Sequence, residues 1–476
     1  TVTVCDTMKP VTRYWDRITK PEQIVRSLPQ ALAVMLDPAD CGPAFFALPQ
    51  DVQAEAYDYP TVFFEPRVHY IRRPGPDARD IEAAAALLRG ATKPLIISGG
   101  GVHYSGAVEA LTAFAERHAI PVVETLAGKA ALVHDHPNYA GPIGVNGSPA
   151  ANAMAEDADV VIAIGTRLQD FTTGSWALFK NPALRFISIN TARWDAVKQH
   201  ASPVIGDALV AIEQLDAAIG DFAAPADWLA LGVSRIGEWH SNLDAIKQRP
   251  VTNVPAYGQV IQVINEVCDA DDYIVSAAGG LPGELVGGWR SKTVGSFDTE
   301  FGMSTMGYEI AGALGAKMAR PQTDVIAFVG DGSYLMMNTD IYSTVFTGHK
   351  VIFIVCDNGG FASINNLQVN QGGVSFNNLL HTARHTELKR VDFAKHAEAL
   401  GARAEHVERL DDLAAAFARA KAADGSYVIV IDVAYDQWTG GGCWWEVGVP
   451  EVSEREQVMV ARGVYEAESK HQRVGV

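Results

Sequence analysis

Two short polar turns contain the side chains best suited to chemistry in this sequence. One turn, Gly330-Asp331-Gly332-Ser333, follows the apolar, β-branched run Val325–Val329. The other turn, Asp357-Asn358-Gly359-Gly360, follows the apolar run Val351–Cys356. Each run has the composition of a buried strand. Because ligands bind at the carboxyl ends of the strands in open α/β sheets, both turns are expected at a ligand-binding edge.

The residue types in these turns predict a divalent metal site. The carboxylate of Asp331, the amide oxygen of Asn358 and a backbone carbonyl, expected from Gly360, are hard oxygen ligands. Oxygens from a diphosphate and a water molecule would complete the octahedral shell that Mg²⁺ requires. The three residues are therefore predicted to bind Mg²⁺.

The same turns offer a place for the diphosphate. Gly330 and Gly332 flank Asp331 without a Cβ atom, so the backbone can approach phosphate oxygens closely. Ser333 and the amides that begin the next helix can donate hydrogen bonds to the diphosphate, helped by the helix dipole. Either turn alone would be an ordinary tight turn, but two turns separated by one helix favour a metal–diphosphate site.

An alternation of strands and helices must position these turns. Residues 255–437 are predicted to form one α/β domain, with a helix at Met337–Thr347 and strands at Tyr273–Ser276, Val325–Val329, Val351–Cys356 and Tyr427–Val433. Residues 77–222 predict a central domain of the same kind, with strands at Pro94–Ser98, Ile120–Glu124, Val160–Ile164 and Phe186–Ile189. Such alternation is typical of an α/β fold with doubly wound parallel sheets.

The remaining residues divide into four regions. Residues 1–56 are interpreted as the end of a further α/β unit, in which helical residues precede the short strand Pro43–Leu48. Residues 57–76 contain several prolines and are interpreted as a linker. Residues 223–254, which are more polar and bounded by prolines, are interpreted as a second linker. Residues 438–476 form a tail that is rich in glycine and tryptophan and then charged and helical.

The composition restricts the classes of partner. The chain of 476 residues has a formal net charge of −18, which argues against binding nucleic acid or an anionic membrane through bulk charge. No apolar run is long enough to predict a membrane span. The five cysteines are scattered without a CxxC pair, which favours a reducing, cytoplasmic setting.

The two turns match the motif of a known family. Gly-Asp-Gly, followed one helix and one strand later by Asp-Asn, resembles the signature of the enzymes that use thiamine diphosphate (ThDP) and Mg²⁺. Gly302-Met303-Ser304-Thr305-Met306 resembles a second family segment. The resemblance implies that Met306 supports the two rings of the cofactor in a V shape. It also implies that the Met306 amide and the Ser304 carbonyl bind the aminopyrimidine.

Further segments resemble one group of hydrolases within this family. They are the hydrolases that open a cyclic 1,2-diketone, 3D-(3,5/4)-trihydroxycyclohexane-1,2-dione, to 5-deoxyglucuronate in bacterial myo-inositol catabolism. The matching segments extend over nearly the whole chain, at Lys9–Thr19, Val68–Ile71, Gly307–Glu309, Phe361–Gln368 and Trp444–Val449.

The resemblance predicts a small, polyhydroxylated cyclic diketone as the substrate. Asn365, Asn366 and Gln368 follow the metal loop and could bind its hydroxyl groups, although ordinary loop solvation or helix capping would also explain them. Trp444 and Trp445 could close the site or could pack on a domain surface.

One family feature is not found in the sequence. The glutamate that activates the pyrimidine is expected upstream of Thr1, in a pyrimidine-binding domain of which residues 1–56 would be the last part. Neither Glu22 nor Glu55 is assigned to this role. The family also implies a homodimer or homotetramer, because the cofactor bridges two subunits. An enzyme resembling acetolactate synthase and an inactive cofactor-binding remnant remain alternatives.

Two weaker motifs are not assigned to ligand binding. Gly99-Gly100-Gly101 follows a strand but lacks the complete pattern of a dinucleotide-binding turn, and the central domain is predicted to bind no nucleotide. His134-Asp135-His136 lacks further ligands nearby and is interpreted as a surface loop.

Overall fold

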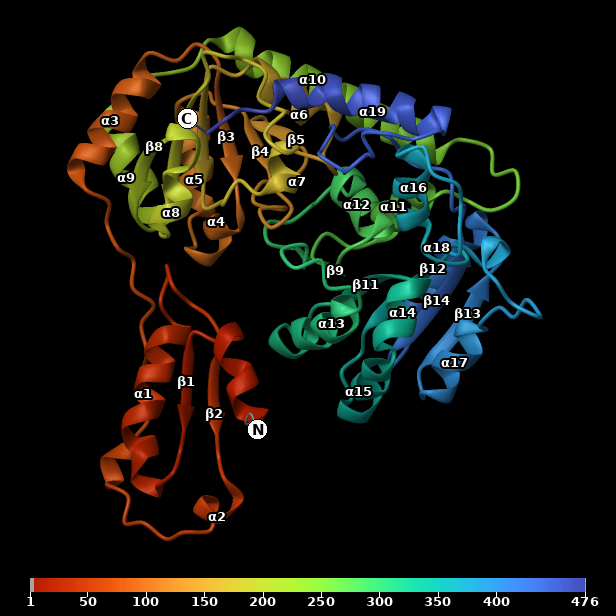
Figure 1. Ribbon diagram of the computed structural model, residues 1–476, viewed down its shortest axis with the longest axis horizontal. Coiled ribbons are helices and arrows are strands. Elements are labelled where there is room, and N and C mark those ends of the chain that lie inside the picture. The colour runs from red at the N-terminus through yellow and green to blue at the C-terminus, as the bar shows by residue number, and fades with distance from the viewer. Residues whose placement is uncertain (1–3, 476) are drawn as a thin grey trace.

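A computed structural model describes residues 4–475 of the chain, so Thr1–Thr3 and Val476, the outermost residues of the predicted terminal regions, lie outside the described part. Within it, two six-stranded parallel sheets are each flanked by helices, and a smaller two-stranded parallel sheet precedes them (Figure 1). This arrangement confirms the α/β prediction with parallel sheets.

The N-terminal unit contains the small sheet. Its strands are β1 (Tyr14–Arg17) and β2 (Ala44–Ala47), which pair in parallel and are connected by helix α1 (Ile24–Met35). Figure 1 shows this unit below the central domain, at the red end of the chain. Strand β1 was not predicted because its aromatic and charged residues lack a strand-like run. The other elements are η1 (Val4–Val11), η2 (Pro21–Gln23), α2 (Gln50–Gln53) and η3 (Thr61–Phe64).

The central domain is built around the sheet with strand order β5-β4-β3-β6-β7-β8. Every residue of the two middle strands, β3 and β6, is buried. Continuous burial follows from a parallel sheet with helices on both faces, which is why these strands are uniformly apolar. The strands are β3 (Pro94–Ser98), β4 (Val122–Glu124), β5 (Tyr139–Pro142), β6 (Val160–Ile164), β7 (Arg185–Asn190) and β8 (Ser202–Ile205).

Helices cover both faces of the central sheet. They are α3 (Ala78–Arg89), α4 (Gly100–Tyr104), α5 (Val108–Arg117), α6 (Pro149–Asp157), α7 (Asp170–Thr173), α8 (Arg193–Ala196), η4 (Lys198–His200) and α9 (Ala208–Ile219).

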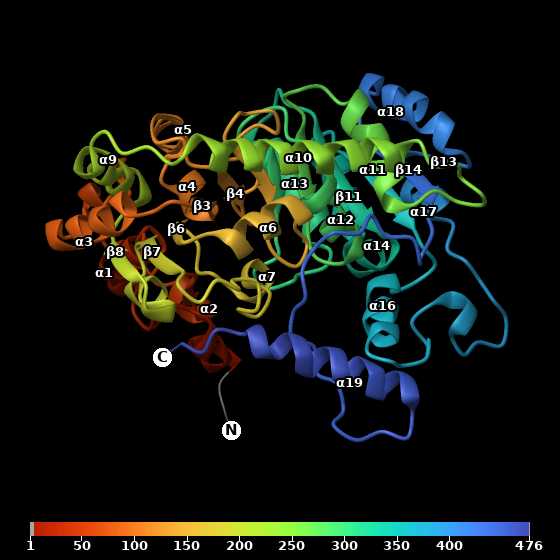
Figure 2. The same ribbon diagram turned by 90° about the horizontal axis from the view of Figure 1, so that it is seen from above.

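Residues 223–254, which were interpreted as a second linker, contain a long helix in the structure. Helix α10 (Ala226–Lys247) packs along the central domain and also contacts the C-terminal domain (Figure 2). The indole nitrogen of Trp228 donates to the Pro94 carbonyl at 2.8 Å, and that of Trp239 donates to the Gly287 carbonyl at 2.9 Å. Buried residues recur every three or four positions along α10, and this helical spacing outweighs the segment's average polarity.

The C-terminal domain contains the sheet with strand order β10-β9-β11-β12-β14-β13. The Gly-Asp-Gly and Asp-Asn turns follow β11 and β12, which are the two middle strands. The strands are β9 (Tyr273–Ser276), β10 (Phe297–Thr299), β11 (Val325–Gly330), β12 (Ile352–Asp357), β13 (Arg403–Val407) and β14 (Tyr427–Asp432).

One helix of this domain begins at the predicted site. The helix predicted at Met337–Thr347 corresponds to α15 (Thr339–Thr347). A further helix, α14 (Asp331–Met337), precedes it and starts directly at the Gly-Asp-Gly turn. The others are α11 (Tyr257–Val267), α12 (Gly280–Gly288), α13 (Tyr308–Ala319), α16 (Ala362–Asn370), η5 (Leu380–Thr382), α17 (Phe393–Ala399), η6 (Leu410–Asp412) and α18 (Leu413–Ala422).

The C-terminal tail returns to the central domain. After a glycine-rich segment, the Trp445 ring packs against Phe171 with the ring centroids 4.9 Å apart. Helix α19 (Glu456–Glu468) and η7 (Ser469–His471) follow, and the Arg473 amide donates to the Trp176 carbonyl at 3.1 Å. Among residues 4–475, no helix combines the length and apolar character that a membrane span needs.

Candidate cofactor site

The two polar turns lie side by side because their strands pair in register. Strands β11 and β12 are hydrogen-bonded neighbours, and Gly330 is the register partner of Cys356. Asp331 and Asp357 therefore both lie at the carboxyl edge of the sheet, and both are buried. The sequence prediction that the turns share one edge of the sheet is confirmed.

A direct hydrogen bond connects the two turns. The backbone amide of Gly360 donates to Oδ2 of Asp331 at 2.8 Å. Gly360 has a φ of 143°, and a Cβ atom there would lie 2.4 Å from the Asn378 carbonyl oxygen. Only glycine fits this conformation and this space.

Asn358 presents an unpaired oxygen in the same region. Its Nδ2 donates to the hydroxyl of Tyr257, a buried residue at the start of α11. Its Oδ1 is buried and has no hydrogen-bond partner in the described part of the chain. A buried amide oxygen without a partner costs free energy, and a cation would satisfy it.

The electrostatics of the edge also favour a cation. Burial, and then the charge of neighbouring Asp357, raises the pKa of Asp331 to about 7. Asp357 is held by Arg390, whose guanidinium lies 2.8 Å from its carboxylate and 3.2 Å from that of Asp432. Asp331 has no such basic partner among the described residues, and a divalent cation would stabilise its charged form. The oxygens of Asp331, Asn358 and Gly360 thus fit the Mg²⁺ site predicted from the sequence.

The residues predicted to bind the diphosphate lie at the start of α14. A Cβ atom on Gly330 would meet nothing within 4 Å, whereas one on Gly332 would lie 3.0 Å from the Phe361 ring. Ser333 is buried. The backbone is therefore open to a ligand at Gly330 and more closely covered at Gly332.

Met306 reaches the same turn from another element. It lies in the segment between β10 and α13, and its Cε methyl is 3.6 Å from the position of a Cβ atom on Gly332. Ser304, two residues earlier, has a φ of 54°. The structure thus brings the predicted ring-supporting methionine to the predicted diphosphate turn.

The predicted substrate residues lie on α16, and two of them already have partners. Asn365 Oδ1 accepts a hydrogen bond from the Ser375 hydroxyl at 2.6 Å, and Gln368 Oε1 accepts one from Asn378. These bonds attach α16 to the segment that follows it. Asn366 is half-buried. The substrate role of all three residues stays a prediction.

Some residues at the site were missed by the sequence interpretation. Tyr257 and Arg390 contact Asn358 and Asp357 from 101 and 33 residues away, and no local pattern marks them. Glu309 belonged to a segment that resembled the family. It is 1% exposed, and its Oε1 has no partner in the described residues. Its burial next to the site could not be read from the segment.

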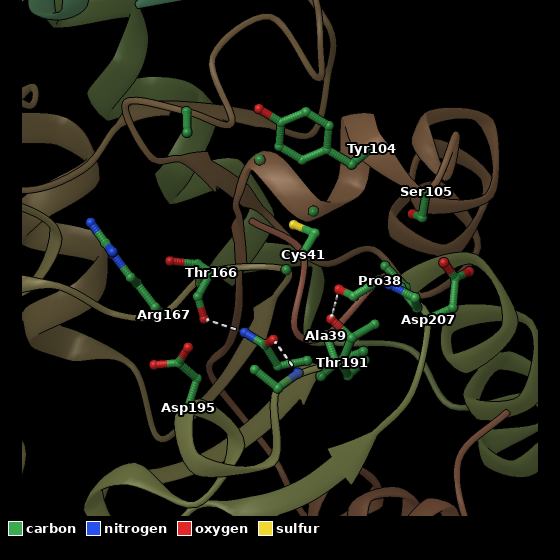
Figure 3. A pocket seen from close by; sticks show the side chains of 18 of the residues that line it. Pro38, Ala39, Cys41, Tyr104, Ser105, Thr166, Arg167, Thr191, Asp195 and Asp207 are labelled. Carbon is green, nitrogen blue, oxygen red and sulfur yellow. Dashed lines mark hydrogen bonds between the residues drawn. The ribbon is translucent and has the colours of Figure 1, made fainter. Parts of the chain in front are cut away.

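A cavity of about 750 Å³ lies at the carboxyl edge of the central sheet (Figure 3). Gly100, Gly101, Thr166 and Asp195 of the central domain line it together with Pro38 of the N-terminal unit. Close packing explains the glycine in the Gly99-Gly100-Gly101 turn, because a Cβ atom on Gly101 would lie 2.6 Å from the Gly165 Cα. That this domain binds no nucleotide stays a prediction.

The histidine motif and the two tryptophans lie elsewhere. His134 is half-buried, and its ring lies 5.6 Å from that of His240. The described part of the chain has no cluster of three His, Cys, Asp or Glu side chains that could hold a metal. Trp444 and Trp445 line a second cavity of about 750 Å³ between α16 and α19.

Comparison with known proteins agrees with this geometry. Residues 81–215 match the model of the thiamine pyrophosphate enzyme central domain, and residues 280–431 match that of the C-terminal TPP-binding domain. Thiamine pyrophosphate (TPP) is another name for ThDP. The second match contains both polar turns.

Three relatives that align over nearly the whole chain are named 3D-(3,5/4)-trihydroxycyclohexane-1,2-dione hydrolase. The Halalkalibacterium halodurans protein is 39% identical over 97% of this chain and 76% of its own length. The Bacillus subtilis protein is 38% identical over 98% of this chain and 77% of its own length. The Clostridium perfringens protein is 39% identical over 96% of this chain and 76% of its own length. With both domain models matched and relatives this similar, the chain belongs to the thiamine pyrophosphate enzymes.

Proposed function

We propose that this protein is a ThDP- and Mg²⁺-dependent hydrolase that cleaves a C–C bond of 3D-(3,5/4)-trihydroxycyclohexane-1,2-dione and yields 5-deoxyglucuronate. The main support is the 39% identity to hydrolases of this name over 97% of the chain, which extends well beyond the cofactor-binding domain. A shared fold alone would support only the cofactor, because one fold serves many reactions.

In this proposal the C-terminal domain binds the diphosphate end of the cofactor and contributes contacts to its rings. Asp331, Asn358 and the Gly360 carbonyl would bind Mg²⁺, and the first residues of α14 would donate to the diphosphate. When bound, ThDP supplies a nucleophilic carbon and an electron sink for breaking a bond next to a carbonyl group. The protein's own contribution is to orient the two rings, through Met306 and Ser304, and to exclude bulk water.

The substrate would be bound by hydrogen bonds, because its ring carries hydroxyl groups on every carbon other than the two ketones and the methylene. Asn365, Asn366 and Gln368 follow the metal loop on α16 and offer amide donors and acceptors. Since Asn365 and Gln368 already bond Ser375 and Asn378, the substrate would share or replace these partners. Water must also enter, because the reaction adds it across the cleaved bond.

The activating glutamate is still expected upstream of Thr1. Glu22 and Glu55 are both exposed in the N-terminal unit, and exposure does not favour a role inside a closed site. We further propose a homodimer or homotetramer. A cytoplasmic location is favoured because all five cysteines are free, as expected of a reducing compartment.

The test is mass spectrometry of the product formed from the cyclic dione with ThDP and Mg²⁺. We expect a product heavier than the substrate by one water molecule, and we expect none from the Asp331→Ala variant. Asp424→Asn serves as the control, because the Asp424 side chain is 99% exposed in the same domain.

Two other results would favour the alternatives. Release of CO₂ from pyruvate without turnover of the dione would indicate an enzyme resembling acetolactate synthase. ThDP binding without turnover of either substrate would indicate a cofactor-binding remnant.

A further inference from the structure

The loop between β10 and α13 has a backbone conformation that needs support. Its predicted contacts to the aminopyrimidine are backbone atoms, the Ser304 carbonyl and the Met306 amide, so the shape of the loop determines whether they can be made. Ser304 has a φ of 54°, in the left-handed region that disfavours residues with a Cβ atom. Ser304 is also exposed, so core packing does not impose this conformation. Such strain persists only where neighbouring interactions hold it.

One carboxylate holds the amides on both sides of Ser304. Oε1 of Glu300 accepts a hydrogen bond from the Met303 amide at 2.7 Å, and Oε2 accepts one from the Thr305 amide at 2.6 Å. Partial burial raises the pKa of Glu300, but these amide hydrogen bonds outweigh it and keep the pKa below the usual value of a glutamate. The carboxylate is therefore charged at neutral pH, and hydrogen bonds to a charged acceptor are the stronger kind.

Other residues fix the two ends of the loop. Arg167 of the central domain, labelled in Figure 3, donates to the Gly302 carbonyl at 3.3 Å. At the far end, the Gly307 amide donates to Oε2 of Glu309 at 2.9 Å. With both ends attached, Glu300 is the side chain that acts on the strained middle of the loop.

We propose that Glu300 is a positioning residue for the cofactor, which fixes the loop around Ser304 in the shape that presents the Ser304 carbonyl and the Met306 amide to the aminopyrimidine. This role rests on the proposed use of ThDP. It requires no contact between Glu300 and the cofactor. Removing the carboxylate should weaken cofactor binding through the loop, without affecting the metal ligands.

The first test is the affinity for ThDP at saturating Mg²⁺, measured by calorimetry on the purified protein. Glu300→Gln keeps the shape of the side chain but leaves one acceptor oxygen for two amides, so one amide loses its bond. We expect affinity to fall about tenfold, in line with the loss of one hydrogen bond to a charged group. Glu300→Asp keeps the charge on a shorter side chain and should give an intermediate loss.

Two further measurements separate positioning from a general loss of structure. Hydrogen exchange in the peptide containing Met303 and Thr305 should accelerate in cofactor-free Glu300→Gln. Adding Ser304→Gly should recover most of the affinity, because glycine adopts this φ without strain. The control is Glu405→Gln, on the opposite edge strand of the same sheet, which should bind ThDP like the wild type.

The outcomes are distinguishable. Unchanged affinity and exchange in Glu300→Gln, with a wild type that binds ThDP, would overturn the role of Glu300 and leave the proposed function intact. Weak binding that Ser304→Gly does not restore, together with a lowered melting temperature, would also overturn it. A wild type that does not bind ThDP would refute the proposed function itself, and this role with it.

Discussion

Replacing Asp331 with asparagine should stabilise the cofactor-free protein while removing its response to Mg²⁺ and ThDP. The asparagine side chain would keep an oxygen to accept the Gly360 amide, and its new NH₂ group could donate to Asp357. The change thus replaces a buried repulsion between two carboxylates with a hydrogen bond. A cation-binding site is expected to destabilise the protein when the cation is absent. A substitution that removes this destabilisation usually also removes function.

The magnitude follows from the pKa of Asp331. Burial and the charge of Asp357 raise this pKa to about 7, so the ionised form is disfavoured in the folded protein relative to the unfolded one. A tenfold change in the ionisation equilibrium corresponds to ~1.4 kcal/mol. The free-energy cost of ionising Asp331 in the folded protein is therefore up to ~4 kcal/mol at pH 8. The stabilisation should be complete above the folded pKa and should vanish as the pH falls toward the ordinary pKa of an aspartate.

Differential scanning calorimetry can measure both parts of this prediction. Without ligands at pH 8, the Asp331→Asn transition should lie at least ~5 °C above that of the wild type, given a few degrees per kcal/mol for a domain of this size. Addition of Mg²⁺ and ThDP should raise the wild-type transition and leave the variant unchanged. Asp424→Asn should behave like the wild type in both conditions. A ligand-free variant less stable than the wild type, or one that still responds to Mg²⁺ and ThDP, would refute this account of the site.

Two further predictions concern polar groups near the site, the half-buried Glu284 and the buried Tyr257. Burial raises the pKa of Glu284 to about 7 against the opposing hydrogen bonds from Thr439, so its contribution to stability is full below pH 4.5 and is lost as the pH rises through 7. Measured by urea denaturation, the free energy of unfolding of Glu284→Gln should therefore fall by ~3 kcal/mol less than that of the wild type between these pH values. An identical pH dependence of the two proteins would contradict the prediction. Tyr257→Phe removes the hydroxyl that accepts a hydrogen bond from Asn358, and we expect about tenfold weaker Mg²⁺-dependent ThDP binding because the amide can then rotate. Isothermal titration that gives wild-type affinity for Tyr257→Phe would show that Asn358 needs no support.

The elements that the sequence predicted best are interior strands of the two large sheets, each with a neighbouring strand on both sides. Pro94–Ser98, Val160–Ile164 and Tyr273–Ser276 have the predicted bounds, because strands buried on both faces are continuous apolar runs. Short strands at or near the sheet edges were missed, as β13 illustrates with the polar sequence Arg403–Val407. Helix α10 within residues 223–254 was not predicted, because its apolar stripe is narrow within a polar segment.

The candidate site was likewise predicted only in part from the sequence. Gly-Asp-Gly and Asp-Asn were recognisable because a strand, a turn and a helix are each encoded by neighbouring residues. Their proximity also followed from the sequence, since consecutive parallel strands present their carboxyl ends at one edge. The cofactor and metal roles of Asp331, Asn358 and Gly360 stay predictions, with geometry that fits them.

The sequence by itself determined the α/β class, the family and the two turns, because these depend on local patterns of apolar residues and glycines. Only the tertiary structure decided which side chains support the site. Tyr257, Arg390 and Glu300 are common residue types without a motif, and each gains its role from packing that brings separate elements together. The pKa of Asp331 has the same origin, because burial and the approach of Asp357 exist only in the folded protein.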